Sequence, residues 1–371
     1  MPKLQQILDA INDLAPWDLA DSWDRVGLQI GSVSQPVRKV MVALDMNQQI
    51  IAEGLAQQVD GFVAHHPLIF KPLTQIDQHT PVGDCITTLI KRDFFLIAAH
   101  TNVDKAENGL NQYLATLLGI GEMESLEPVA AQNYKIVVYT PIEYLHQIRT
   151  AMIEAGAGII GEYTGCSFEQ TGVGTFKPNS AAQPFIGKPG ESTTVSEVRL
   201  EMSAGAHNLS EILKAVSANH PYDQPVTDVY PLVSSSRHGL GRIGTLKTAI
   251  NFQDLCLTVT ERLSAKGIRV IGAPSRMIKR VAICSGNGGS LIPTAIKQRA
   301  DVYITGDLDY HDFLTAKDSD LMVIDAGHWT TEHCFISLIT NYLQKFFTPG
   351  NDLEVVPSTT IQTEPYLIFM S

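Results

Sequence analysis

Short apolar runs that alternate with amphipathic helical segments are the feature of this sequence that most restricts its fold. In residues 1–128, apolar runs occupy 39–44, 61–64 and 94–99, and helical periodicity marks 4–14, 48–58 and 81–92. In residues 237–371, apolar runs at 281–284, 302–304 and 321–324 lie between helical patterns near 251–265, 289–299 and 331–347. Because strands that alternate with helices form βαβ units, both segments predict an α/β fold, with two similar lobes and mainly parallel sheets.

The segment 129–236 follows a different order. Its pattern predicts strands and helices in the order β-α-β-β-α-β, at 134–139, 142–154, 167–176, 194–202, 209–218 and 226–231. This order is typical of the ferredoxin-like plan, with a long loop at 177–191 and a serine linker at 234–236. We therefore expect an N-terminal lobe (1–128), an inserted domain (129–236) and a C-terminal lobe (237–371). One continuous sheet across the chain is the alternative.

The balance of charge limits the classes of partner. Lysine and arginine number 27 against 39 acidic residues, a net charge of 27 − 39 = −12, which disfavours binding to nucleic acid. No run approaches the ~18 apolar residues of a membrane span, and the start of the sequence lacks the basic and apolar regions of a signal peptide. The five cysteines are widely spread without a C-x-x-C motif, which favours reduced thiols in the cytoplasm.

Histidine and acidic side chains directly follow two apolar runs of the first segment. His65 and His66 come after the run 61–64, and extended backbone points adjacent side chains to opposite sides, so each imidazole has access to a different metal ion. His100 and Asp104 come after the run 94–99. The structural alternatives are polar residues that finish a strand, and a turn or helix cap at Asp104.

The second segment repeats this arrangement at its last apolar run. His328 and Glu332 follow residues 321–324, and a spacing of four places both side chains on one face of a helical turn. A first-turn glutamate stabilised by the helix dipole is the alternative for Glu332. Because ligands of open α/β sheets bind at the carboxyl ends of the strands, we expect all of these side chains to meet at one edge.

The combined set offers nitrogen and oxygen ligands for two metal sites. A carboxylate can bridge two ions, and two-metal sites activate water for hydrolysis. Zinc, manganese, iron and cobalt all suit such ligands. His100 and His311 are candidates for moving protons, although His311 is equally compatible with a surface position on a helix. The glycine-rich stretch 285–290 predicts either a phosphate seat or a tight strand-to-helix turn.

Several of these motifs together resemble one known family. The matching stretches, in order and spacing, are 23–29, 65–67, 100–104, 306–311 and 325–332. The family comprises the dinuclear-metal hexameric proteins known as GTP cyclohydrolase I type 2 homologues, and the segment 129–236 looks like the P-II/CutA-like insert of the longer members. The resemblance implies two divalent ions per chain, with Glu332 or Asp104 bridging, on the ligands His65, His66, Asp104, His328 and Glu332.

The same resemblance implies an assembly and an activity. Members form toroidal homohexamers whose metals face an inner cavity, and the inserts would cap the ring as trimers. We expect a metal-dependent hydrolase in which water attacks an electrophilic carbon of a small molecule, such as C8 of a purine nucleotide. The alternative is a non-catalytic metal-binding hexameric scaffold with a regulatory, signal-sensing insert.

Overall fold

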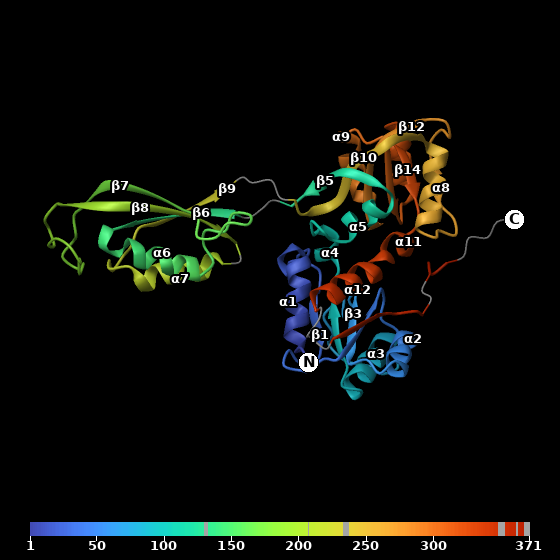
Figure 1. The fold of residues 1–371 in the computed structure, drawn as a ribbon, viewed down its shortest axis with the longest axis horizontal. Coiled ribbons are helices and arrows are strands. Elements are labelled where there is room, and N and C mark those ends of the chain that lie inside the picture. Colours follow the sequence, from blue (N-terminus) through green and yellow to red (C-terminus); the bar gives the residue numbers. More distant parts are fainter. Residues whose placement is uncertain (130–132, 207, 233–236, 348–352, 361–362, 367–371) are drawn as a thin grey trace. The chain divides into compact units, whose positions relative to one another are not determined.

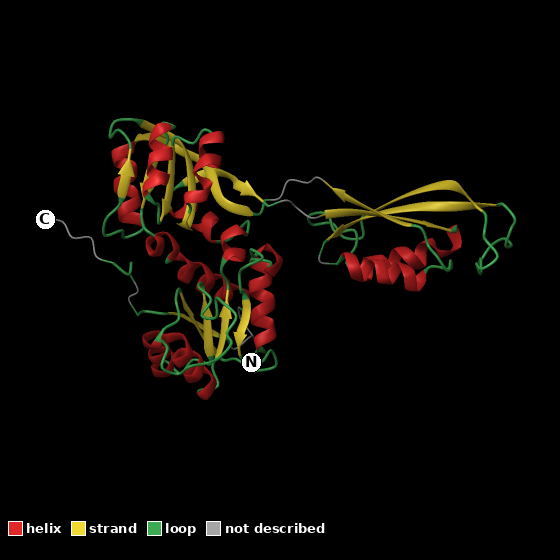
Figure 2. Cartoon of the chain, turned by 180° about the vertical axis from the view of Figure 1, so that it is seen from behind, coloured by secondary structure: helices red, strands yellow, loops and turns green. Residues whose placement is uncertain are grey.

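The structure is a computed structural model of the 371-residue chain. It describes residues 1–129, 133–206, 208–232, 237–347, 353–360 and 363–366. The chain divides into two compact units, residues 1–129 together with 237–371, and residues 130–236. Figures 1 and 2 show that both units mix helices with sheets. The serine linker expected at 234–236 lies outside the described residues.

The helices lie mostly where the apolar periodicity predicts them. Leu4, Ile7, Leu8 and Ile11 form the buried stripe of the first helix, as the 3.6-residue repeat requires. The α-helices are α1 (Leu4–Leu14), α2 (Gln48–Ala56), α3 (Pro81–Lys91), α4 (Thr101–Lys105), α5 (Leu110–Leu117), α6 (Leu145–Glu154), α7 (Leu209–Asn219), α8 (Phe252–Arg262), α9 (Ile292–Lys297), α10 (Tyr310–Asp318), α11 (His328–Glu332) and α12 (Cys334–Phe346). Short 3-10 helices occupy Trp17–Leu19, Ile142–Tyr144 and Gly289–Leu291.

The first sheet is mainly parallel, as expected. Its strands, in spatial order, are β1 (Gly27–Ile30), β4 (Phe95–Ala98), β3 (Gly61–Ala64), β2 (Lys39–Ala43) and β15 (Glu354–Pro357). The pair β1 and β4 is antiparallel, and the other three neighbouring pairs are parallel. The edge strand β15 comes from the last segment of the chain, so the sheet is completed by residues far away in sequence.

The second sheet contradicts the expectation of mainly parallel strands. Its order is β11 (Arg269–Ile271), β14 (Met322–Asp325), β13 (Val302–Gly306), β12 (Met277–Asn287), β10 (Gly239–Asn251) and β5 (Ile120–Pro128). Only the pairs β12–β13 and β13–β14 are parallel, and the other three are antiparallel. The physical reason is that β5 leads into the segment 130–236 and β10 leads out of it. The two strands therefore run in opposite directions side by side, without the crossover helix that parallel neighbours need.

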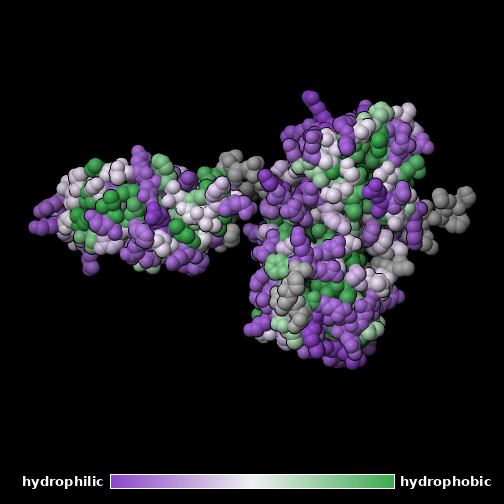
Figure 3. Space-filling model, in the orientation of Figure 1, coloured by the Kyte–Doolittle hydropathy of each residue, from purple (hydrophilic) through white to green (hydrophobic). Residues whose placement is uncertain are grey.

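One hydrophobic core joins the two sheets. Alternate residues of β2 and β12, such as Val40 and Val281, face this core together with α1, α5, α8 and α12. The opposite faces are covered separately, by α2 and α3 on the first sheet and by α9 and α10 on the second. Hydrophilic side chains cover most of this unit's face in Figure 3, so its apolar residues are largely enclosed.

Residues 130–236 form a four-stranded antiparallel sheet with two helices. The order is β7 (Ser167–Phe176), β8 (Thr193–Gly205), β6 (Asn133–Thr140) and β9 (Thr227–Leu232). Helices α6 and α7 lie on one face of this sheet (Figures 1 and 2), where Ile148 and Ile212 pack against Ile136 and Leu200. Residues 177–192 form the loop between β7 and β8.

Among the residues that the structure describes, no helix is both long enough and apolar enough to cross a membrane.

Candidate metal centre

Four histidines meet at the carboxyl ends of the strands in the two-sheet unit. His65 and His66 follow β3, His100 follows β4 and is the N-cap of α4, and His328 begins α11 after β14. The ring centroids of His65 and His66 are 5.0 Å apart, and those of His65 and His100 are 5.1 Å apart. His328 approaches from the second sheet, with its centroid 5.5 Å from that of His66. The cluster is thus built by both sheets.

Glu332 is the carboxylate around which these imidazoles gather. Its Oε2 lies 3.0 Å from Nε2 of His66 and 3.0 Å from Nε2 of His328. Its other oxygen, Oε1, lies 3.7 Å from Nε2 of His65. The spacing of four residues along α11 brings His328 and Glu332 together. The two oxygens of Glu332 therefore face different histidines.

Asp104 supplies the second carboxylate. It lies within α4, is buried, and places Oδ1 3.8 Å from Nε2 of His65. The backbone carbonyl of Asp104 accepts a hydrogen bond from Asn111, and Ser285 donates its hydroxyl proton to Oδ1 at 3.2 Å. Asn111 also accepts the backbone N–H of Ser285 at 2.7 Å, so β12 of the second sheet helps to orient this carboxylate.

A separate partner holds the Nδ1 atom of each imidazole. The partners are the carbonyl of Ala99 for His65 (2.9 Å), Asp45 for His66 (2.7 Å), Asp24 for His100 (3.0 Å) and Asp307 for His328 (2.8 Å). An imidazole whose Nδ1–H donates to an oxygen has a free lone pair on Nε2. This arrangement is the usual one for histidines that bind metals, because the outer partner fixes the tautomer and the ring orientation.

The carboxylates around His66 and His328 favour the protonated form of these two imidazoles. Burial alone would lower the pKa of His66, but the contacts and charges of Asp45 and Glu332 outweigh it and raise that pKa to about 10. For His328, burial is likewise outweighed by Glu332 and Asp307, and the pKa rises to about 9. The centre therefore holds positive charge in the place where divalent ions would supply it.

The surroundings of the centre shift the pKa values of the two buried carboxylates in opposite directions. Burial and the nearby charge of Glu332 raise the pKa of Asp104, despite the opposing effect of His65. Burial would also raise the pKa of Glu332, but the surrounding imidazoles, with His65 first, hold it well below its usual range. Repulsion between the two carboxylates is relieved either by a proton on Asp104, as its raised pKa indicates, or by a cation bound beside them.

Three structural observations fit a metal at this centre. Two overlapping groups, His65–His66–His100 and His66–His328–Glu332, each have their ligand atoms within 4.8 Å of one another. In the described part of the chain, Nε2 of His65 and Oε2 of Glu332 are buried without hydrogen-bond partners, although Oε2 is close to two imidazoles. These nitrogen and oxygen atoms converge on one place from both sheets, which is the geometry expected of ligands to a common ion.

A glycine of β12 makes the third observation. Gly286 adopts a positive φ of +61°, and a Cβ at this position would overlap Oε1 of Glu332 and crowd Nε2 of His328. The backbone thus leaves room for the cluster at a point where any side chain would fill it. The residues present therefore fit a bound divalent cation.

The structure does not bring every expected residue to the centre. His65, His66, His100, Asp104, His328 and Glu332 lie together, whereas His311 is exposed on α10 beside Tyr310. Among the described residues, no hydrogen bond or ion pair links His311 to the cluster.

The glycine-rich stretch 285–290 behaves as a tight turn. The backbone N–H groups of Ser285, Gly286 and Gly289 donate to Asn111, Thr331 and Asn287 respectively. Because these donors are used within the protein, they are not free to hold a phosphate. The alternative of a strand-to-helix turn is the one the geometry favours.

Three acidic residues were missed as functional candidates in the sequence. Asp24, Asp45 and Asp307 hold the outer nitrogens of His100, His66 and His328. Asp24 is buried, and its pKa is held low because bonds to His100 and Thr101 outweigh burial. The sequence carries a signal for two of them, since Asp45 directly follows the apolar run 39–44 and Asp307 comes three residues after the run 302–304.

Comparisons with known proteins agree over nearly the whole chain. The family model Duf34/NIF3 (NGG1p interacting factor 3) matches residues 2–364. A Bacillus subtilis protein named GTP cyclohydrolase 1 type 2 homolog is 40% identical over 327 residues, 88% of each chain. A protein of the same name from Halalkalibacterium halodurans is 34% identical over 365 residues, 98% of each chain.

Solved structures resemble the whole fold. A Bacillus cereus protein related to NIF3 has a TM-score of 0.82 and 34% identity, with 99% of each chain covered. A Staphylococcus aureus protein has a TM-score of 0.83 and 28% identity, again with 99% of each chain covered.

Proposed function

This chain belongs to the Duf34/NIF3 family, and we propose that it is a hydrolase that depends on two divalent metal ions. The observation that carries the proposal is the convergence of four imidazoles and the Glu332 carboxylate in two overlapping groups, with the buried Asp104 carboxylate 3.8 Å from His65. The identity of the metal stays open among zinc, manganese, iron and cobalt, because nitrogen and carboxylate ligands suit all four.

We assign the ligands as His65, His66, Asp104, His328 and Glu332. Glu332 is the better candidate for the bridging carboxylate, because Oε1 faces His65 and Oε2 faces His66 and His328. Asp104 turns one oxygen, Oδ1, toward His65 and receives Ser285 on that same atom. This difference supports a terminal role for Asp104.

The protein's own residues would position water and move protons. Bound divalent ions act as Lewis acids and make a water molecule more acidic. His100 is half-buried at the rim, and Asp24 fixes its Nδ1, so Nε2 can accept a proton from water and return it to a leaving group. We assign this role to His100 rather than to His311, because His311 stands apart from the cluster.

The names of the relatives support a purine nucleotide, or a related ring, as the substrate class. In the proposed step, the oxygen of water bonds to C8 of the purine and a ring C8–N bond breaks. The proton that water loses passes through His100 to the leaving nitrogen, so atoms and charge balance. The product would retain the nucleotide with its five-membered ring opened.

The proposal is tested by incubating the metal-loaded protein with purine nucleotides and analysing the products by mass spectrometry. We expect a product heavier by one water, and its complete loss in Glu332→Gln. A protein that retains its metals but turns over no member of a broad nucleotide panel would contradict the proposal.

The second candidate function is a non-catalytic metal-binding scaffold with a regulatory insert. It is supported by the separate compactness of residues 130–236, whose strand order β7-β8-β6-β9 matches the ferredoxin-like plan. Deletion of residues 129–236 separates the two candidates. Turnover that survives the deletion favours an enzyme with an accessory domain, and intact metal content without turnover in either form favours the scaffold.

We also propose a cytoplasmic, toroidal homohexamer in which the inserts form trimeric caps. Large apolar side chains that are exposed in the single chain support contacts between inserts, among them Ile160, Tyr163, Phe168 and Val173. The free state of all five cysteines agrees with a reducing compartment. Sedimentation analysis of the full chain tests the hexamer, and the deletion of 129–236 tests the caps.

A further inference from the structure

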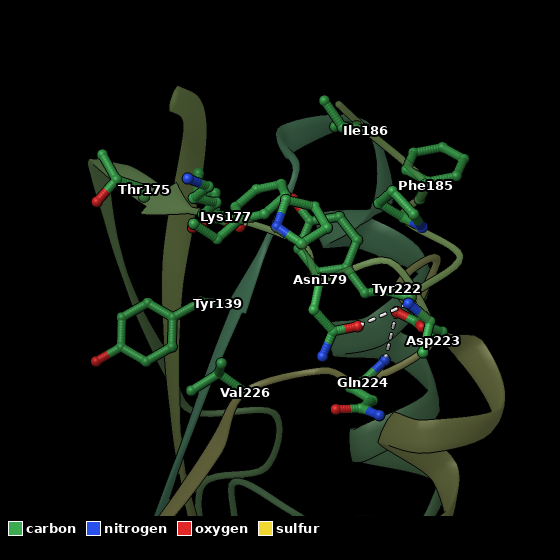
Figure 4. A pocket seen from close by; sticks show the side chains of 17 residues that line it. Tyr139, Thr175, Lys177, Asn179, Phe185, Ile186, Tyr222, Asp223, Gln224 and Val226 are labelled. Carbon is green, nitrogen blue, oxygen red and sulfur yellow. Dashed lines mark hydrogen bonds between the residues drawn. The ribbon is translucent and has the colours of Figure 1, made fainter. Parts of the chain in front are cut away.

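The unit formed by residues 130–236 has a cavity of its own. A cavity of about 500 Å³ opens where the end of β7 and the following loop face residues 222–226 (Figure 4). Ligand pockets in proteins typically enclose a few hundred to a thousand Å³. The cavity contains none of the metal-ligating residues, so binding of a ligand there does not depend on the proposed hydrolase activity.

Aromatic rings form much of its wall. The ring of Tyr222 has centroid distances of 6.4 Å to Phe176 and 6.3 Å to Phe185. Phe185 is 52% exposed although it belongs to this aromatic group, so its face is available to a ligand. Tyr139, on β6, lines another side of the cavity.

A carboxylate without a cationic partner lies against these rings. Glu197 accepts a hydrogen bond from the Tyr222 hydroxyl at 2.9 Å. Burial, together with Glu197, raises the pKa of Tyr222, so the hydroxyl stays protonated and donates. Within the described residues, neither Lys177 nor any arginine forms an ion pair with Glu197. Figure 4 shows the side chain of Lys177 extending toward Thr175 and away from Tyr222.

The charged side chains that line the cavity therefore disfavour anions and neutral apolar molecules as ligands. Glu197 and a second carboxylate, Asp223, would repel an anion. A neutral apolar molecule would remove water from Glu197 without replacing its interactions. A cation would regain that interaction and would also be attracted to the faces of the aromatic rings.

We propose that this cavity binds a small organic cation, a protonated amine on an apolar or aromatic body, with Glu197 as its counter-ion. The amine contacts the Glu197 carboxylate beside its hydrogen bond from Tyr222, and the apolar body contacts Phe176 and Phe185. The loop 177–192 supplies part of the wall, so binding restricts its conformations.

Isothermal titration of the full chain with three matched probes tests the proposal. Phenethylamine is cationic at neutral pH, phenethyl alcohol is its neutral counterpart, and hydrocinnamate is an anion of similar shape. We expect one phenethylamine per chain, bound about tenfold more tightly than the alcohol, with no binding of the anion. Glu197→Gln should remove this preference, because the amide retains a hydrogen-bond acceptor for Tyr222 but not the charge.

Two further variants keep the test decisive. Gly174→Ala places a Cβ against the Glu197 carboxylate and should displace it, with the same loss of preference. Glu211→Gln is the control, since Glu211 is exposed on α7, pairs with Lys214 and does not line the cavity. Equal binding of the amine and the alcohol, an unchanged affinity in Glu197→Gln, or no binding of the amine at millimolar concentration would overturn the proposal.

Discussion

The metal centre and the cavity of the insert differ in how the protein holds their polar groups. At the metal centre, each of the four imidazoles has its Nδ1 fixed by an oxygen, and both carboxylates are buried. In the cavity, Glu197 has one hydrogen bond among the described residues, from the Tyr222 hydroxyl. The loop beside it is held by local contacts, such as the N–H of Ala181 donating to the Asn179 side chain.

This difference indicates two modes of recognition. The centre presents ligand atoms whose positions are set by two sheets before an ion arrives, which favours affinity through preorganisation. In our proposal the cavity selects its ligand by charge and by contact with aromatic ring faces. Changes at the centre should therefore have large and specific effects, and changes in the insert smaller ones.

Replacement of Glu332 by glutamine should produce the largest effect. The variant removes the charge that balances the imidazoles, and its amide nitrogen cannot bind a metal. We expect loss of all tightly bound divalent metal, measured by elemental mass spectrometry after loading and dialysis. Glu354→Gln is the control, because Glu354, on β15, pairs with Lys39 apart from the cluster. Full metal content in Glu332→Gln would contradict the assignment of Glu332 as a metal ligand.

Gly286→Ala should have the next largest effect on metal binding, and Gly119→Ala is its matched control. Both glycines have positive φ, +61° and +77°, so both variants should lose about 1 kcal/mol of stability. Only the Cβ at Gly286 would overlap Glu332, whereas that at Gly119 meets nothing within 4 Å. We expect metal affinity to fall about a hundredfold in Gly286→Ala alone, measured by competition with a chromogenic chelator. Equal affinities in the two variants would show that the close approach is unimportant.

Asp24→Asn should have an intermediate effect. Asp24 contacts no proposed metal ligand, but it orients His100 and accepts the N–H and hydroxyl of Thr101. Because Thr101 begins the helix α4 that carries the proposed ligand Asp104, loss of these bonds should weaken metal binding by about tenfold. The same chelator competition measures it, with Asp60→Asn as the control, because the Asp60 carboxylate accepts the backbone N–H groups of Arg38 and Lys39 apart from the cluster. A parallel loss in both variants would indicate general destabilisation instead.

The smallest effect should be the change in stability of the inserted domain as the pH falls. His220 donates from Nε2 to the carbonyl of Tyr139 at 2.9 Å and accepts at Nδ1 from the N–H of Tyr222 at 3.1 Å. Burial lowers the pKa of His220 below the ordinary 6.5. The unfolded state therefore binds more protons below pH 6.5, so the stability contributed by His220 is present above that pH and is lost as the pH falls. For one proton, the free energy of unfolding cannot change by more than about 1.4 kcal/mol per pH unit.

Urea unfolding followed by the methyl NMR signal of Ile148, in the core of the insert, measures this slope. His220→Gln should flatten the pH dependence between pH 7 and pH 5, and His146→Gln, at an exposed position of α6, should leave it unchanged. A slope that persists in His220→Gln would assign the acid response to other groups.

Much of the centre could be anticipated from the sequence, because strand ends are visible as apolar runs. His65, His100 and His328 each follow such a run, and the structure brings them together. The role of His65 and His328 as metal ligands and that of His100 in proton transfer stay predictions. The partners that orient them could not be assigned from the sequence. The pairing of Asp24 with His100 spans 76 residues and depends on how the chain folds between them.

The pairing of strands in the second sheet also could not be predicted from the local sequence pattern. Apolar runs identify strands but carry no direction, so the antiparallel pairing of β10 with β5 and β12 was not foreseen. The strand β15 is four residues long and joins the first sheet from the far end of the chain. The role of Gly286 depends on its positive φ and on the nearness of Glu332, both of which are tertiary properties.

The central claim is that the centre is a preformed site for two divalent ions, and metal stoichiometry tests it most directly. The wild-type protein would be stripped with chelator, loaded separately with zinc, manganese, iron(II) and cobalt, dialysed, and assayed for metal and protein. We predict two tightly bound ions per chain for at least one of these metals. Fewer than one ion per chain with every metal would contradict the claim.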